Sequence, residues 1–302
     1  MKLLTCLVCV LMCASCLGTV SAQAPRTDSP FYAMDTNIWS WQGRTPEEVA
    51  KLLKSLGYDG YGHGGTQDID AYLAALDAQG LGLFSTYVGL DLDGDPKIDH
   101  KVSDVFRKFK DRNAMLWLFV QSRKYAPDSD AGDAAAVEAI RRLADEAHEQ
   151  NVKIALYPHT GFYVENLDDA LRIAEKVNRR NVGVTFNLCH WLKVDGDTDP
   201  TRTLQQAMPY LFQVSVNGAD SGDTRSMNWD RLIQPLDSGT YDVARLLRTL
   251  RELGYTGPIA LQGYGIKGDP KQNLARSIQA WRKMVESKKG SDAKPLERTS
   301  GG

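Results

Sequence analysis

Residues 152–190, "VKIALYPHTGFYVENLDDALRIAEKVNRRNVGVTFNLCH", place two apolar runs on either side of an amphipathic segment. The runs at 152–158 and 183–188 are nearly continuous in apolar residues, as in strands of a parallel sheet that is covered on both faces. The segment that begins near Leu167 has its apolar residues at helical spacing. This order of strand, helix and strand predicts a parallel βαβ unit.

The same alternation runs through the rest of the chain. In the first helical pattern, Thr45 is the expected N-cap, Pro46 and Glu48 suit the first turn of a capping box, and Gly57 ends the helix. Further helices are expected over 134–150 and from Tyr241 onward. Strands are expected at residues 32–38, 58–62, 82–88, 114–121, 152–158, 183–188, 211–216 and 258–262.

Eight units of this kind predict an α/β protein, a single-domain (β/α)8 TIM barrel over residues 31–286. A repeated motif supports this fold. The sequence "LGYDG" at 56–60 and the similar "LGYTG" at 253–257 each lie between a helix and the next strand. An open doubly wound sheet is the competing fold, but it rarely has eight such units. The glycine-rich stretches at 60–65 and 263–268 are expected to be tight turns after strands two and eight.

The first residues have the pattern of a leader. Lys2 precedes an apolar run that ends at Val20, and small residues follow, so residues 1–24 are expected to be a signal peptide and 25–30 a linker. The mature chain is therefore expected to be exported, to a periplasm or outside the cell, with no membrane span. Lipidation at Cys16 is the alternative, but Cys13 stands where lipoprotein signals have leucine.

The composition of the chain limits the kinds of molecule that the protein is expected to bind. The 302 residues are 42% hydrophobic with a formal charge of -2, which suits one large core and gives no electrostatic reason for binding nucleic acid. Cys189 is the one cysteine after the leader, so no internal disulfide is expected. The polar tail at 287–302 is expected to be disordered. The oligomeric state does not follow from these features.

Reactive groups of a (β/α)8 barrel lie at the carboxyl ends of its strands. Here these ends carry mostly neutral hydrogen-bonding and aromatic side chains. They are Asp35, His63, Tyr87, Gln121, Arg123, Tyr157, His159, Asn187, His190, Ser215, Asn217, Gln262 and Tyr264. Amides and imidazoles bond hydroxyls as donors and as acceptors, and rings cover the apolar face of a sugar. A small carbohydrate is therefore the expected ligand.

Several segments together resemble the xylose isomerase-like TIM-barrel superfamily, the sugar phosphate isomerases and epimerases, over nearly all of the mature chain. They are the opening stretch, "YLFQVSVNGAD" (210–220), "IQPLDSGTYDVARLLRTLRELGYTGPIALQGYG" (233–265) and "NLARSIQAWRK" (273–283). The resemblance implies a barrel that isomerises or epimerises sugars. It also implies a divalent metal, held by Glu, Asp, His and Glu at the ends of strands five to eight.

At those four positions this chain has Tyr157, Asn187, Ser215 and Gln262. Every acid is replaced by a neutral group, although a histidine of the family's pattern is retained as His190. Hard divalent ions need carboxylate charge to offset the loss of their water. We therefore expect no metal cofactor, and this subgroup is expected to work without the usual ion.

The expected chemistry is proton transfer beside a sugar carbonyl, with His190 and His159 as the catalytic groups. Glu165 and Lys193 are weaker candidates for acid and electrophile. The expected substrate-binding residues are Tyr157, Asn187, Asn217, Gln262, Trp191, Tyr264, His63, Arg123 and Asp35. Two alternatives stay open: a carbohydrate-binding barrel without catalysis, and a metal-dependent isomerase with atypical ligands.

Overall fold

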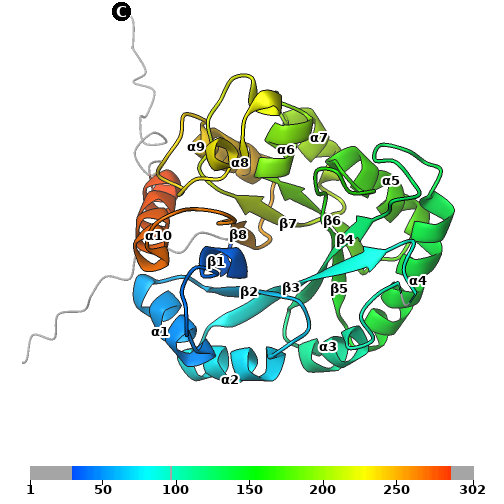
Figure 1. Ribbon diagram of the computed structural model, residues 1–302, viewed down its shortest axis with the longest axis horizontal. Helices are drawn as coiled ribbons and strands as arrows, with labels where there is room; N and C mark the ends of the chain where they lie inside the picture. The colour runs from blue at the N-terminus through cyan, green and yellow to red at the C-terminus, as the bar shows by residue number, and fades with distance from the viewer. Residues whose placement is uncertain (1–28, 96, 287–302) are drawn as a thin grey trace, which may run out of the picture.

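A computed structural model describes residues 29–95 and 97–286, and it folds into a closed barrel. Every neighbouring pair of strands is parallel, and β8 pairs with β1 to close the ring. The helices surround the strands (Figure 1). The predicted (β/α)8 fold is confirmed. The predictions for residues 1–28 and 287–302, the leader and the tail, lie outside the described residues.

The strands are β1 (Phe31–Met34), β2 (Gly60–Gly64), β3 (Gly82–Asp91), β4 (Met115–Gln121), β5 (Lys153–Leu156), β6 (Val182–Asn187), β7 (Leu211–Val216) and β8 (Ile259–Leu261). The helices are α1 (Pro46–Leu56), α2 (Ile69–Gln79), α3 (Val102–Phe109), α4 (Asp133–Glu149), α5 (Leu167–Val177), α6 (Leu188–Val194), α7 (Thr201–Ala207), α8 (Trp229–Leu232), α9 (Val243–Glu252) and α10 (Pro270–Glu286). The structure also has two short 3-10 helices, η1 (Asp35–Asn37) and η2 (Thr224–Ser226).

The start and stop signals of α1 act as the sequence predicts. The Thr45 hydroxyl accepts from the Glu48 amide at 3.3 Å, and the Glu48 carboxylate accepts from the Thr45 amide at 2.9 Å. Gly57 ends the helix at φ +86°, and Gly254 has the same φ in the repeated motif. A left-handed residue at both sites turns the chain from a helix into the next strand.

The prediction of a tight turn at residues 60–65 is wrong, because most of this glycine-rich stretch forms β2. A Cβ on Gly60 would lie 2.0 Å from the carbonyl oxygen of Gly82 on β3. One on Gly62 would lie 2.7 Å from the ring of Tyr32 inside the barrel. The glycines therefore allow close approach of neighbouring groups rather than a change of direction.

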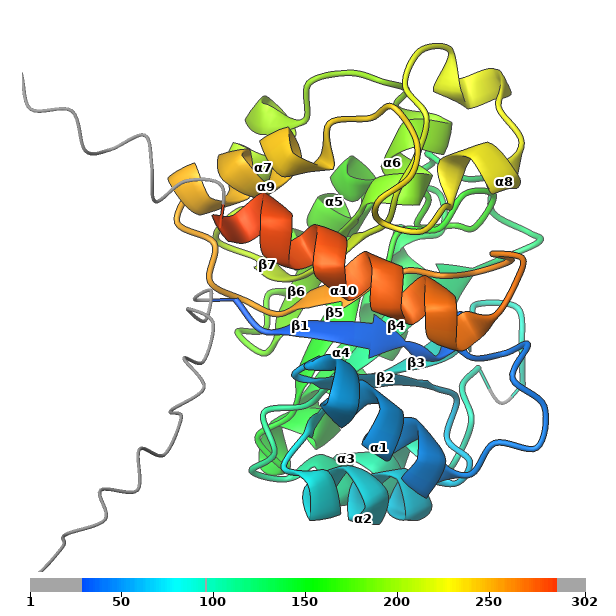
Figure 2. The same ribbon diagram turned by 90° about the vertical axis from the view of Figure 1, so that its left-hand side faces the viewer.

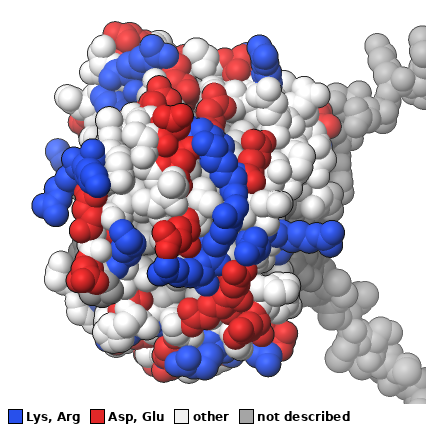
Figure 3. Space-filling model, turned by 90° about the vertical axis from the view of Figure 1, so that its right-hand side faces the viewer, with Lys and Arg blue, Asp and Glu red and all other residues white. Residues whose placement is uncertain are grey.

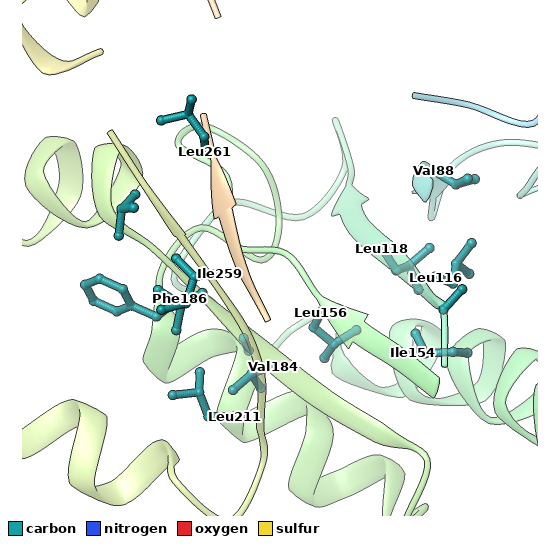
Figure 4. Packing of buried hydrophobic residues seen from close by; sticks show 14 of the residues in the cluster. Val88, Leu116, Leu118, Ile154, Leu156, Val184, Phe186, Leu211, Ile259 and Leu261 are labelled. Carbon is teal, nitrogen blue, oxygen red and sulfur yellow. The ribbon is translucent and has the colours of Figure 1, made fainter. Parts of the chain in front are cut away.

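Residues on each strand alternate between the surrounding helices and the barrel interior. Outward side chains such as Leu118, Val184 and Phe186 form the main apolar core (Figure 4). Inward aromatic rings, among them Tyr32 and Trp117, fill the barrel. The indole of Trp117 donates to the Thr185 hydroxyl, which satisfies its buried N–H.

The carboxyl ends of the strands lie on one side of the barrel, the side to which the arrow of β1 points in Figure 2. On the face formed by α4 and α5, acidic and basic side chains alternate (Figure 3). Two exposed ion pairs there are Arg142 with Glu138 and Arg179 with Asp145. Within the described residues, no helix has the length and apolar character needed to cross a membrane.

Candidate active site

Two imidazoles and a phenol meet at the carboxyl ends of β5 and β6. The ring centroids of His159 and His190 are 4.2 Å apart, and Tyr157 presents its ring edge-on to His190 at 5.7 Å. Phe162 stacks on His159 at 4.0 Å, and Trp229 of α8 packs edge-on against His190 at 5.4 Å. Strand β5 and the first turn of α6 thus bring together the two histidines that the sequence singled out.

The backbone C=O and N–H of Thr160 hold the two imidazoles in opposite tautomers. Its carbonyl oxygen lies 3.0 Å from Nδ1 of His159, and a carbonyl only accepts, so this Nδ1 carries the proton. Its N–H donates to Nδ1 of His190 at 3.2 Å, so that nitrogen is unprotonated. His159 is left with a lone pair on Nε2, and His190 with an N–H. Neither Nε2 bonds to any residue that the structure describes.

Both imidazoles are held neutral near pH 7. Burial lowers the pKa of His159, against a smaller effect of its bond to Thr160. Burial, together with the nearby His159, holds the pKa of His190 well below its ordinary value. A neutral His159 can accept a proton, and a neutral His190 can donate a hydrogen bond to an oxygen that gains charge.

The buried state of His190 predicts a stability that depends on pH. Its folded-state pKa lies below the unfolded value of about 6.5, so the unfolded chain binds more protons between the two values. The free energy of unfolding is therefore full above about pH 6.5 and falls as the pH drops toward the folded pKa. Urea denaturation of wild type and His190→Gln at pH 7 and pH 5 measures this loss, which the variant should show to a lesser degree. His148→Gln, on an exposed helix end, should behave as wild type; equal loss in all three proteins contradicts the assignment.

Beneath the histidines the interior is lined by neutral polar groups. Gln262 donates through Nε2 to the Tyr157 hydroxyl at 3.3 Å and accepts at Oε1 from the Thr36 hydroxyl at 2.7 Å. Nδ2 of Asn187 and Oγ of Ser215 are buried without a hydrogen-bond partner among the described residues. The two residues are neighbours in the register of β6 and β7. Such atoms cost about 1–3 kcal/mol each unless a ligand or water satisfies them.

The four positions of the family's metal ligands do not fit a hard divalent ion. Burial raises the pKa of Tyr157 well above its ordinary value, so the hydroxyl stays protonated. Asn187, Ser215 and Gln262 add amides and an alcohol but no negative charge. Across residues 29–95 and 97–286, no three His, Cys, Asp or Glu side chains are grouped to hold a metal ion.

Several predicted site residues lie at the rim of the barrel. Nδ2 of Asn217 donates to the carbonyl oxygens of Gly218 and Leu232, which holds the loop after β7, while its Oδ1 is buried without a partner among described groups. Tyr264 is 51% exposed in the loop after β8. Asp35 accepts from Nε1 of Trp39 at 2.9 Å, and burial raises the pKa of its carboxyl. Asp35 therefore positions an indole.

Two residues that were predicted to contact the ligand, His63 and Trp191, have side chains that point away from the barrel interior. His63 packs against Tyr72 of α2 and bonds the carbonyl oxygen of Gln67, because it shares the outer face of β2 with Tyr61. Trp191 is 8% exposed and packs on Phe186 in the core between sheet and helices. Neither side chain belongs to the candidate site.

The remaining candidates have local partners. Arg123 is exposed, and its backbone amide donates to Asp93 at 2.6 Å. Glu165 accepts from the amide of Gly161 at 2.6 Å, and Lys193 donates to two loop carbonyls. Cys189 is a buried free thiol, as expected for a small hydrophobe, and burial raises its pKa to about 12.

Four residues of the site were missed by the sequence argument: Thr36, Thr160, Phe162 and Trp229. Thr36 and Thr160 lie next to Asp35 and His159, so their closeness to the strand ends was visible. Thr36 bonds to Gln262 and Thr160 bonds to His190, and each bond joins segments that are far apart in the chain. The spacing of residues along the sequence does not predict such contacts.

The comparisons with known proteins agree with this fold. The family model described as xylose isomerase-like TIM barrel matches residues 50–284. The chain belongs to this family. A search of the curated proteins gave no match.

Solved structures of the family share the fold at low identity. The 3-keto-D-glucoside 4-epimerase YcjR from E. coli, in apo form, is 18% identical, with a TM-score of 0.67 over 84% of this chain and 99% of its own. The D-allulose 3-epimerase from Methylomonas sp., in complex with D-allulose, is 16% identical, with a TM-score of 0.65 over 86% and 99%. The IOLI protein with a bound zinc atom is 16% identical, with a TM-score of 0.66 over 85% and 97%.

Proposed function

We propose that this protein is a sugar isomerase or epimerase that moves a proton beside a carbonyl through His159, without a divalent metal. The observation that carries the proposal is the pair of bonds from the backbone C=O and N–H of Thr160, which leave one imidazole as a base and the other as a donor. This assigns the base to His159 and the electrophile to His190, the two histidines that the sequence predicts as the catalytic groups. The unpaired Nδ2 of Asn187 and hydroxyl of Ser215 suit a polyhydroxylated ligand.

The proposed reaction conserves protons and needs no redox partner. Nε2 of His159 takes the proton from the carbon next to the substrate carbonyl, and the C–H electrons form the enediolate. Nε2–H of His190 donates to the oxygen that becomes negative. The imidazolium of His159 then returns the proton to the neighbouring carbon, while the proton of the adjacent hydroxyl moves to the former carbonyl oxygen, which gives an isomer. Alternatively, a water protonates the other face of the same carbon and the resulting hydroxide takes the proton from His159, which gives an epimer.

Hydrogen exchange with solvent tests the proposal directly. The solved relatives are named for D-allulose and for 3-keto-D-glucosides, so we choose these as the first substrates, in D2O. With EDTA present and no metal detected by elemental analysis, we expect loss of the NMR signal of the proton next to the carbonyl. Exchange that stops with EDTA and returns with Mn²⁺ or Mg²⁺ supports the metal-dependent alternative. Binding without exchange supports a silent carbohydrate-binding barrel.

Export is part of the proposal and rests on residues 1–24 alone. A mature protein that begins at Gln23 or Pro25, as read by N-terminal sequencing, supports cleavage after Ala22 or Ala24. A lipidated Cys16 at the mature N-terminus contradicts it.

A further inference from the structure

Two exposed aromatic rings stand together at the rim of the barrel, beside the interior site. Trp39 is 48% exposed and Tyr264 is 51% exposed, and their rings meet edge to face at 5.5 Å. Trp39 follows β1 and Tyr264 follows β8, two strands that are neighbours in the barrel (Figure 1). Along with Thr36, Ser40 and Lys267, they line a hollow of about 510 Å³. This volume falls within the range of about 300–1,000 Å³ typical of ligand pockets.

Two hydrogen bonds hold parts of the wall of the hollow in place. Nε1 of Trp39 donates to Asp35 at 2.9 Å, which fixes the plane of the indole. Nδ2 of Asn37 donates to the carbonyl oxygen of Leu261 at 2.7 Å, which ties the segment after β1 to β8. A site held in place before its ligand arrives loses less entropy on binding.

A chain of hydrogen bonds also links the wall of the hollow to the interior site. Thr36 lines it, and the Thr36 hydroxyl donates to Gln262, whose amide donates in turn to the Tyr157 hydroxyl. Tyr157 packs on His190. Two residues, Gln262 and Tyr157, therefore lie between Thr36 of the hollow and His190, so a substrate with its reacting carbon at the histidines could extend toward the hollow.

We infer that the hollow binds a second sugar ring, so that the substrate is a glycoside or disaccharide rather than a monosaccharide. The inference rests on the proposed function, because it places the reacting ring at the histidines. The aromatic faces suit the apolar C–H face of a pyranose. Thr36, Ser40 and Lys267 supply donors and acceptors for its hydroxyls, without the paired carboxylates that a cation would require.

The test compares ketoses with and without a glycosyl group. The probes are lactulose and maltulose, each with a ketose end, against D-fructose. In Tyr264→Ala and in Trp39→Ala, the ratio of kcat/KM for disaccharide over monosaccharide should fall about tenfold or more, which is about 1.4 kcal/mol. Tyr264→Phe, which keeps the ring, should retain the ratio. Unchanged Tm values show that the variants fold.

Calorimetric binding of the same probes separates the two proposals. If no ketose exchanges hydrogen but Tyr264→Ala weakens disaccharide binding selectively, the proposed function fails and the second-ring site stands. If exchange occurs and the ratio is the same in wild type, Tyr264→Ala and Trp39→Ala, the inference fails alone. It is also overturned if the wild type binds neither disaccharide, or if Lys267→Ala abolishes binding of fructose 6-phosphate while the aromatic variants change nothing.

Discussion

Replacing His159 by glutamine should lower kcat/KM for hydrogen exchange by about 10²–10⁴-fold, the usual contribution of a positioned general base. Glutamine keeps a polar side chain of similar reach, but its amide does not accept a proton near neutral pH. The lone pair on Nε2 of His159 exists because Nδ1 is committed to the Thr160 carbonyl. The measurement is the rate of proton loss beside the carbonyl in D2O, at saturating and at low substrate.

The matched control is His100→Gln, the same substitution at a histidine whose side chain is 84% exposed on the surface. It should leave the exchange rate at the wild-type value. His190→Gln should also lose rate, although glutamine still offers an N–H to the developing oxyanion, so its loss should be smaller than that of His159→Gln. A larger loss in His190→Gln would reverse the two roles, and wild-type rates in both variants would remove the histidines from the mechanism.

Much of the fold was readable from the sequence because local signals agree with the barrel. The cap at Thr45, the stop at Gly57 and the apolar run over 211–216 each specify an element without reference to the rest of the chain. The failure at β2 has a physical cause. Its glycines are required by close approach of Gly82 and Tyr32, and contacts between strands leave no local pattern.

The candidate site could be predicted only in part from the sequence. Whether a side chain points into the barrel or toward the helices depends on the exact position of its residue within the strand. His63 and Tyr61 are two residues apart on β2, so His63 shares the outer face with Tyr61, which packs in the core between strands and helices. His190 lies in the first turn of α6 and not on β6, so strand alternation does not govern its direction. The tautomers of the two histidines depend on the backbone C=O and N–H of one residue, Thr160, and only a three-dimensional structure reveals these bonds.

Replacing Arg172 by methionine should destabilise the fold by about 3–5 kcal/mol, the cost of leaving a buried charge without its partner. Arg172 donates to Asp169, whose side chain is fully buried, and its Nε lies 3.1 Å from Asp133, which is 5% exposed. Lys176 and Tyr163 still reach Asp133 in the variant, but they do not reach Asp169. Urea denaturation followed by circular dichroism gives the free energy of unfolding.

The same substitution should also affect the site, because Asp169 holds the loop that carries His159. Its Oδ2 accepts from the amide of Glu165 at 3.1 Å, and the Glu165 carboxylate accepts from the amide of Gly161. Arg142→Met is the control, since Arg142 pairs with Glu138 on the exposed face of α4 and an exposed pair contributes less than about 1 kcal/mol. Equal destabilisation by the two substitutions would contradict the buried pair. A stability loss with an unchanged exchange rate in the folded variant would show that the loop keeps His159 in place without Arg172.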